Sequence, residues 1–155
     1  MTPKSLERLS KVHPALAERV KTLASNLLNH NINIEVVQGL RTFEQQNALF
    51  AQGRTTPGKR VTNARGGQSN HNYGLAVDVC PFKNGQPDWD DDGAFEIIGS
   101  EAKKLDLEWG GDWQRFPDRP HLELGGLTIK ECYHLHRQGG LQAVWDRATK
   151  LQEAV

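Results

Sequence analysis

This sequence of 155 residues has no long apolar run and only two cysteines. No stretch has the length and apolar character of a membrane-spanning helix, and the first residues lack the apolar centre of a secretory signal peptide. We therefore expect synthesis in the cytoplasm without a signal peptide, and no stable association with a membrane. Cys80 and Cys132 are too few for a disulfide framework and form no C-x-x-C motif, so we interpret both as ordinary thiols.

An excess of either charge is also missing, since 19 basic residues balance 19 acidic ones. The distribution is uneven, because residues 1–65 contain ten Lys/Arg and four Asp/Glu, whereas residues 66–126 contain five and twelve. The basic N-terminal third could attract an anionic polymer, but a solvated surface is the simpler interpretation. No nucleic-acid-binding motif is present, so we expect no nucleic-acid partner.

The length suits one compact domain, and no linker or internal repeat divides it. We expect a monomer with a single domain over residues 1–155, in which 127–155 form a C-terminal helical extension packed on the rest. Helical spacing and capping boxes predict helices over about 14–28, 42–52, 94–105, 128–137 and 141–152. Alternation of apolar and polar residues predicts strands over about 32–36, 75–80, 107–109 and 121–124. Helices grouped around a small antiparallel sheet make an α+β fold, and residues 53–70 read as a long surface loop.

Alternation within two of the strands predicts which face carries polar chemistry. In residues 75–80 the branched apolar side chains must face the core, so Asp78 lies on the opposite face. The face expected to point away from the core is that of Ala76, Asp78 and Cys80. In residues 121–124 both leucines point inward, which places His121 and Glu123 on the other face. If these strands pair, Asp78 and His121 lie on one surface within reach of a single ion.

Two imidazoles and one carboxylate, those of His71, Asp78 and His121, would leave a tetrahedral Zn²⁺ ion one open position for water. The sequence therefore predicts a hydrolase with one Zn²⁺ ion as its cofactor. Such a centre also needs a carboxylate that is not a ligand and that moves protons. Asp118 is our choice for this base, and Glu123 is the alternative; otherwise Glu123 would orient an imidazole.

Asp88-Trp89-Asp90-Asp91-Asp92-Gly93 matches the start of a calcium-binding loop. The twelfth position of that loop, where a bidentate Glu belongs, is Gly99. We therefore interpret the segment as a turn and the start of a helix.

The pattern Ser69-x-His71-x-x-Gly74-x-Ala76-x-Asp78, followed by Asp118-x-x-His121-x-Glu123, resembles the zinc peptidases that cut bacterial cell-wall peptides. This family includes D-alanyl-D-alanine carboxypeptidases, the dipeptidases of vancomycin resistance, and L-alanyl-D-glutamate endopeptidases used as phage endolysins. The blocks 38–42 and 109–113 are similar to two further family segments. The tryptophan block and the aspartate at position 118 are closest to the L-alanyl-D-glutamate group.

The resemblance implies a fold shared with these peptidases and with Hedgehog signalling domains, and it implies roles by matched position. The zinc ligands would be His71, Asp78 and His121, and Asp118 would be the general base. Arg41 would polarise the scissile carbonyl or stabilise its oxyanion, which suits a fixed guanidinium; the alternative is a surface arginine ahead of a helix cap. Gln38 and Ser69 would bind substrate, although Ser69 could equally shape the loop.

The function that the resemblance implies is a zinc-dependent peptidoglycan endopeptidase of the endolysin type. It would hydrolyse the L-alanyl-D-glutamate bond of stem peptides in the cell wall, after holin-type release through a membrane lesion. A D-alanyl-D-alanine carboxypeptidase is the nearer alternative. A non-catalytic zinc-containing wall-binding module is a third, against which the intact Asp118 argues, because a binding module needs no base.

Overall fold

The computed structural model describes residues 1–154, which fall into two compact units. The first unit contains Met1–Gly39 and Leu75–Gly125. The second contains Leu40–Gly74 and the chain from Gly126 onward. The expected C-terminal extension therefore groups with residues 40–74, while one domain over the whole chain stays a prediction.

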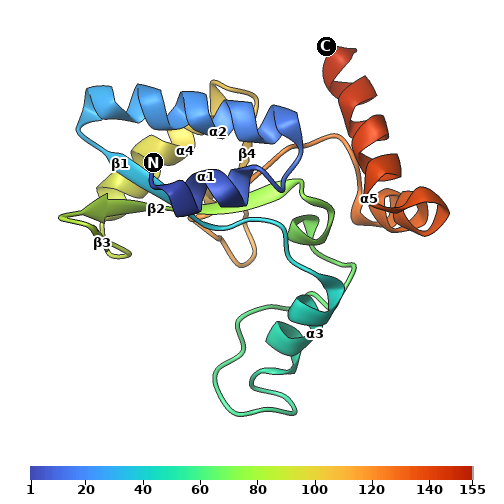
Figure 1. The fold of residues 1–155 in the computed structure, drawn as a ribbon. Helices are drawn as coiled ribbons and strands as arrows, with labels where there is room; N and C mark the ends of the chain where they lie inside the picture. Colours follow the sequence, from blue (N-terminus) through green and yellow to red (C-terminus); the bar gives the residue numbers. More distant parts are fainter. Residues whose placement is uncertain (155) are drawn as a thin grey trace. The chain divides into compact units, whose positions relative to one another are not determined.

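The first unit is built on one antiparallel sheet, shown in Figure 1. Its strands run in the order β1-β2-β5-β4, and the short β3 pairs with β2 outside this path. Their bounds are β1 Asn33–Gln38, β2 Ala76–Lys83, β3 Gln86–Pro87, β4 Glu108–Trp109 and β5 His121–Glu123. The predicted α+β class is confirmed. The strands that contain Asp78 and His121 do pair, which meets the condition set for the two residues to share one surface.

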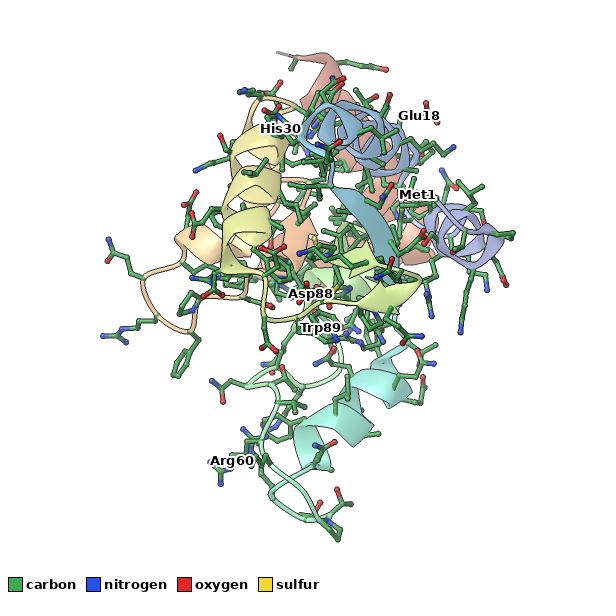
Figure 2. The ribbon with its side chains drawn as sticks, turned by 90° about the vertical axis from the view of Figure 1, so that its left-hand side faces the viewer. Met1, Glu18, His30, Arg60, Asp88 and Trp89 are labelled. Atoms are coloured by element: carbon green, nitrogen blue, oxygen red, sulfur yellow. The ribbon has the colours of Figure 1, made fainter. Side chains whose placement is uncertain are left out.

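Helices of the first unit cover this sheet. They are α1 Pro3–Leu9, α2 Pro14–Leu27, the 3₁₀ turn η1 Leu28–His30, and α4 Asp92–Lys103. Helical spacing of Leu16, Val20, Leu23 and Leu27 predicts the apolar stripe of α2, and all four side chains are fully buried. This helix packs against α4 and β1. Figure 2 labels His30 beside α4, where its Nε2 lies 3.2 Å from the Glu101 carboxylate. Burial of this helical stripe against α4 and the sheet removes apolar surface from water and so stabilises the unit.

The central strand β2 departs from the prediction made from alternation. Ala76 and Cys80, expected to point away from the core, are both completely buried, and of the three residues only Asp78 keeps partial exposure. The prediction is wrong for the two small residues because β2 lies between β1 and β5 and is covered on both faces. Alternation in sequence reports which face is more polar, and small side chains fit either environment.

The segment 88–93 is a turn and a helix start, as predicted. Asp91 caps α4 by accepting a hydrogen bond from the Ala94 amide at 3.0 Å. Lys83 Nζ lies 3.4 Å from the Asp88 carboxylate and 3.1 Å from that of Asp91. Figure 2 labels Asp88 and Trp89 in this turn. The side chains of Asp88 and Asp91 are thus engaged by Lys83, and that of Asp91 also by a helix N-terminus.

The second unit contains α3 Phe43–Ala51, the 3₁₀ turn η2 Asn70–Tyr73, and α5 Ile129–Glu153. Both predicted capping boxes are present, and α5 is interrupted by non-helical backbone at Gly139 and Gly140, as the sequence predicts. Between α3 and η2 the chain is irregular apart from one isolated bridge, in agreement with the predicted loop. Trp145 of α5 donates its indole N–H to the Tyr73 carbonyl at 2.8 Å, so α5 packs against η2.

Among residues 1–154, no helix has both the length and the hydropathy to cross a bilayer. The two cysteines are free and buried.

Replacing Glu35 tests the polar contact between α1 and β1. Its carboxylate accepts hydrogen bonds from Thr2 N at 2.9 Å, from the Thr2 hydroxyl at 3.0 Å and from the buried Ser5 hydroxyl. Burial raises the pKa of Glu35, but the hydrogen bonds from Ser5 and Thr2 outweigh burial and hold it below the ordinary value of 4.5. The stability that this carboxylate contributes is therefore present above pH 4.5 and is lost as the pH falls through the folded-state pKa.

We expect Glu35→Gln to lower the free energy of unfolding by about 1–2 kcal/mol at pH 7, measured by urea denaturation. The difference should shrink toward pH 3. Glu7→Gln, at an exposed position of α1, should change the free energy by less than about 0.5 kcal/mol. An equal loss at pH 7 and pH 3 would contradict this account of Glu35.

Candidate metal centre and catalytic residues

Asp78 and His121 lie opposite each other on neighbouring strands of the first unit. The register of β2 and β5 pairs their α-carbons, and His121 Nδ1 is 3.5 Å from Asp78 Oδ1. The His121 side chain is only 7% exposed and that of Asp78 is 19% exposed. Two ligands of a tetrahedral Zn²⁺ ion, at bond lengths of about 2.0–2.1 Å, stand about 3.3 Å apart. The separation in this pair fits two ligands of one ion better than a direct hydrogen bond.

Glu123 occupies the other nitrogen of the same imidazole. His121 Nε2 lies 2.7 Å from Glu123 Oε1. If Nε2 carries the proton and donates it to Glu123, Nδ1 presents its lone pair toward Asp78. The contact therefore orients the imidazole, which is one of the two roles that the sequence leaves open for Glu123.

The pKa of His121 reflects this arrangement. Burial lowers the pKa, but the close carboxylates of Asp78 and Glu123 outweigh burial and raise it to about 9. Nearby Glu108, which lies opposite Glu123 on β4, has a raised pKa because of burial and the Glu123 charge. The three carboxylates create a negative field around one buried imidazole, and such a field favours a cation.

Asp118 is placed by a tight turn just before β5. Its amide donates to the Gly110 carbonyl at 2.8 Å, and its own carbonyl accepts from the His121 amide at 3.2 Å. Its carboxylate lies 4.0 Å from His121 Nδ1 and is 46% exposed. An exposed carboxylate beside the paired residues, but less close to His121 than Asp78 is, suits a proton carrier better than a ligand.

Gln38 completes a row across three strands. It is the last residue of β1, and its α-carbon pairs with that of Asp78 after a register shift in the strand. Gln38, Asp78 and His121 therefore follow one another across the sheet. Gln38 is exposed, and its register position is beside Asp78.

The remaining predicted residues lie in the second unit. His71 is buried in η2, and its carbonyl accepts the Arg41 amide at 3.0 Å. The Ser69 hydroxyl caps η2 by accepting the His71 amide at 3.2 Å. Gly74 ends η2 in the left-handed conformation with φ of +65°, where a β-carbon would meet the Trp145 ring. Arg41, Ser69 and His71 are thus held together by backbone geometry.

Two positioning residues were missed by sequence reasoning. Gln46 of α3 is completely buried and accepts the Arg41 guanidinium at 2.8 Å, while its amide group donates to the Ala64 carbonyl at 2.9 Å. The ring of Trp113 packs near that of His121, with the two ring centroids 4.9 Å apart. Gln46 follows the capping-box residue Gln45, and Trp113 lies in the block 109–113. Neither position belongs to a sequence pattern from which its tertiary contact could be predicted.

Comparison with known proteins places the chain in a family. A family model described as D-alanyl-D-alanine carboxypeptidase matches residues 62–124. The peptidoglycan L-alanyl-D-glutamate endopeptidase CwlK of Bacillus subtilis is 40% identical over 130 residues, which are 74% of each chain. The L-alanyl-D-glutamate peptidase of Escherichia phage T5 is 32% identical over 124 residues, which cover 74% of this chain and 81% of the phage protein. The chain belongs to the L-alanyl-D-glutamate endopeptidase family.

Solved structures agree with this membership. The L-Ala D-Glu endopeptidase ChiX of Serratia marcescens has a TM-score of 0.61 and 26% identity, over 81% of this chain and 89% of ChiX. The D,D-pentapeptidase VanY of a VanB-type resistance cassette, solved with Zn(II), shares the fold, with a TM-score of 0.56 and 14% identity over 86% of this chain and 83% of VanY. As a member of this family, the protein is a metallopeptidase.

Gly110→Ala tests how the turn places Asp118. A β-carbon at position 110 would lie 2.3 Å from the Asp118 carbonyl oxygen and 3.0 Å from the His121 β-carbon. We expect a free energy of unfolding lower by about 1–3 kcal/mol, because backbone must move to relieve the clash. Gly93→Ala is the matched control, since its β-carbon would meet only the Asp91 carboxylate at 3.7 Å. Equal melting temperatures for the two variants would contradict the close approach.

Proposed function

We propose that the protein hydrolyses the L-alanyl-D-glutamate bond of peptidoglycan stem peptides, as a monomer acting on the cell wall after holin-type release. The observation that carries the proposal is the match to CwlK, at 40% identity over 74% of both chains. The Asp78–His121 pair with Glu123 behind it supports a metal-dependent hydrolysis, because its donor set and spacing suit Zn²⁺.

His71, Asp78 and His121 are the proposed ligands of one Zn²⁺ ion. Each offers one ligand atom, and together they supply two nitrogens and one oxygen. His71 belongs to the second unit, and Leu75 begins the second segment of the first unit. Only residues 72–74 lie between them, so the chain that connects His71 to the first unit is short. When bound, the Zn²⁺ ion supplies a Lewis acid that lowers the pKa of water and polarises a carbonyl.

Asp118 is the proposed general base and acid. Its carboxylate takes a proton from the attacking water and returns that proton to the departing amine. Its side chain is 46% exposed and is therefore open to substrate. Arg41 donates charge-assisted hydrogen bonds to the oxyanion of the tetrahedral intermediate, and Gln46 holds its guanidinium for this role. Gln38 and Ser69 are proposed to contact the substrate.

Peptidoglycan digestion separates this function from its alternatives. Purified peptidoglycan is incubated with the zinc-loaded protein, and new termini are identified by mass spectrometry. We expect new D-Glu amines, with Ala left on the upstream fragment. Free D-Ala would instead identify a D-alanyl-D-alanine carboxypeptidase, the activity in the description of the matching family model. Absence of any product would leave a binding module.

Asp118→Asn should reduce kcat at least about 10³-fold, because the amide cannot accept the proton. Zinc content, measured by inductively coupled plasma mass spectrometry, should stay at one ion per chain, since Asp118 is not a proposed ligand. Asp112→Asn, at an exposed carboxylate paired with Lys103, is the control and should keep full activity. Retention of more than about a tenth of the activity in Asp118→Asn would assign the base elsewhere, with Glu123 the next candidate.

Metal removal and ligand replacement form a separate test. We expect a chelator to abolish hydrolysis and Zn²⁺ to restore it. His71→Ala, Asp78→Ala and His121→Ala should each lower zinc content below about a tenth of an ion per chain under dilute chelator. His30→Ala, which removes an exposed imidazole paired with Glu101, should leave it unchanged. Full zinc content in any of the three variants would remove that residue from the ligand set.

A further inference from the structure

The second unit contains an open cavity that none of the proposed catalytic residues lines. Its volume is about 410 Å³. One wall is the loop 65–68, and the other is the beginning of α5, with Ile129, Lys130 and Tyr133. The Tyr133 side chain is an exposed large aromatic group, at 40% exposure. The cavity therefore offers an aromatic surface to a ligand from solvent.

The cavity is positively charged. Arg65 and Lys130 line it, and the Arg137 guanidinium lies 5.9 Å from the centre of the Tyr133 ring. No acidic residue is among the lining residues. The neighbouring carboxylate of Glu131 accepts hydrogen bonds from the amide and hydroxyl of Thr128, at 3.1 Å and 3.0 Å. A ligand with negative charge is the complement of such a surface.

The loop wall is built from backbone that is held in place on both sides. The Gly66 amide donates to Asn47 at 2.7 Å, and the Gly67 amide donates to the buried Asn72 at 3.0 Å. The Gly67 carbonyl accepts the Tyr73 hydroxyl at 2.6 Å. Gly67 has φ of +87°, and a β-carbon there would lie 3.2 Å from the Tyr133 ring. Glycine thus allows the loop to approach Tyr133, which fixes the shape of the cavity.

This wall is continuous with the segment that carries His71. Gln68, the last residue of the wall, is three residues before His71, so their α-carbons are at most about 11 Å apart. Asn72 also accepts the Ser69 amide at 3.2 Å, which joins the wall to η2. A ligand bound against Gln68 would therefore lie within about three residues of extended peptide from a group bound beside His71.

We propose that this cavity is a subsite for a carboxylate-bearing part of the wall peptide, seated on Tyr133 with its carboxylate between Arg65 and Lys130. The subsite rests on the proposed function, since that function supplies an acidic peptide as substrate. A guanidinium and an ammonium bind a carboxylate by charge-assisted hydrogen bonds, and the tyrosine ring covers the aliphatic part of the peptide. The cavity thus extends recognition beyond the scissile bond.

The test uses a peptide without a scissile bond, namely the stem-peptide product that begins at D-Glu. Its affinity for the zinc-loaded protein is measured by calorimetry. We expect the double variant Arg65→Ala/Lys130→Ala to bind it about tenfold more weakly, and amidation of the peptide carboxyls to cause a similar loss with the unaltered protein. Tyr133→Ala should weaken binding by about threefold to tenfold, whereas Tyr133→Phe keeps the ring and should bind normally.

Kinetics on intact muropeptides give the second readout. The double variant should raise KM by about tenfold with kcat unchanged, because the cavity contacts no reacting atom. Lys150→Ala, which removes a cation of α5 that does not line the cavity, should change neither constant. A circular dichroism spectrum and melting temperature equal to those of the unaltered protein exclude misfolding as the cause.

The outcomes separate the subsite from the proposed function. Normal cleavage and normal peptide affinity in the double variant would overturn the subsite and leave the function standing. Binding of the peptide without cleavage of muropeptides would overturn the function and retain an acidic-peptide site. Equal affinity for the amidated peptide, or binding of a phosphodiester wall polymer in place of the peptide, would overturn the subsite as proposed.

Discussion

The contact of one buried imidazole with carboxylates at both of its nitrogens is the interaction on which the proposed chemistry depends. His121 meets Asp78 across the sheet and Glu123 two residues along its own strand. Both contacts follow from strand geometry, because residues opposite each other and residues two apart share a face. A slip of the β2–β5 register by one residue would turn Asp78 to the other face. The antiparallel register is therefore as important to this centre as the residue types.

The parts of the structure that the sequence predicts are those with a periodic or paired signal. The buried stripe of α2, the capping boxes at Thr42 and Thr128, and the Gly139–Gly140 interruption are all present. The alternation around Asp78 and His121 also predicts the strand face on which each residue lies, and the observed pairing of the two strands brings them together. In each case a local physical requirement, such as burial of one face or satisfaction of helix amides, leaves a signature in neighbouring residues.

The parts that could not be predicted depend on tertiary contacts. α1 is seven residues long and packs on β1 through a buried Ser5 and the distant Glu35, so no periodic pattern marks it. Burial of Ala76 and Cys80 follows from the central position of β2, which strand alternation does not report. Gln46 supports Arg41 from inside the second unit, and only the fold shows that its amide is buried.

In the second unit, the irregular segments are held in place by hydrogen bonds from side chains to the backbone. They do not form the backbone hydrogen bonds of a sheet. Asn72 accepts the amides of Gly67 and Ser69 and donates to the Arg41 carbonyl, so one buried amide group ties three separate backbone positions. The adjacent Tyr73 hydroxyl donates to the Gly67 carbonyl, and burial raises its pKa to about 12, which keeps it a neutral donor. Because His71 and Arg41 belong to the same network, a change in the loop wall would be felt at both. Recognition in the cavity and the geometry of the proposed site thus depend on one set of buried hydrogen bonds.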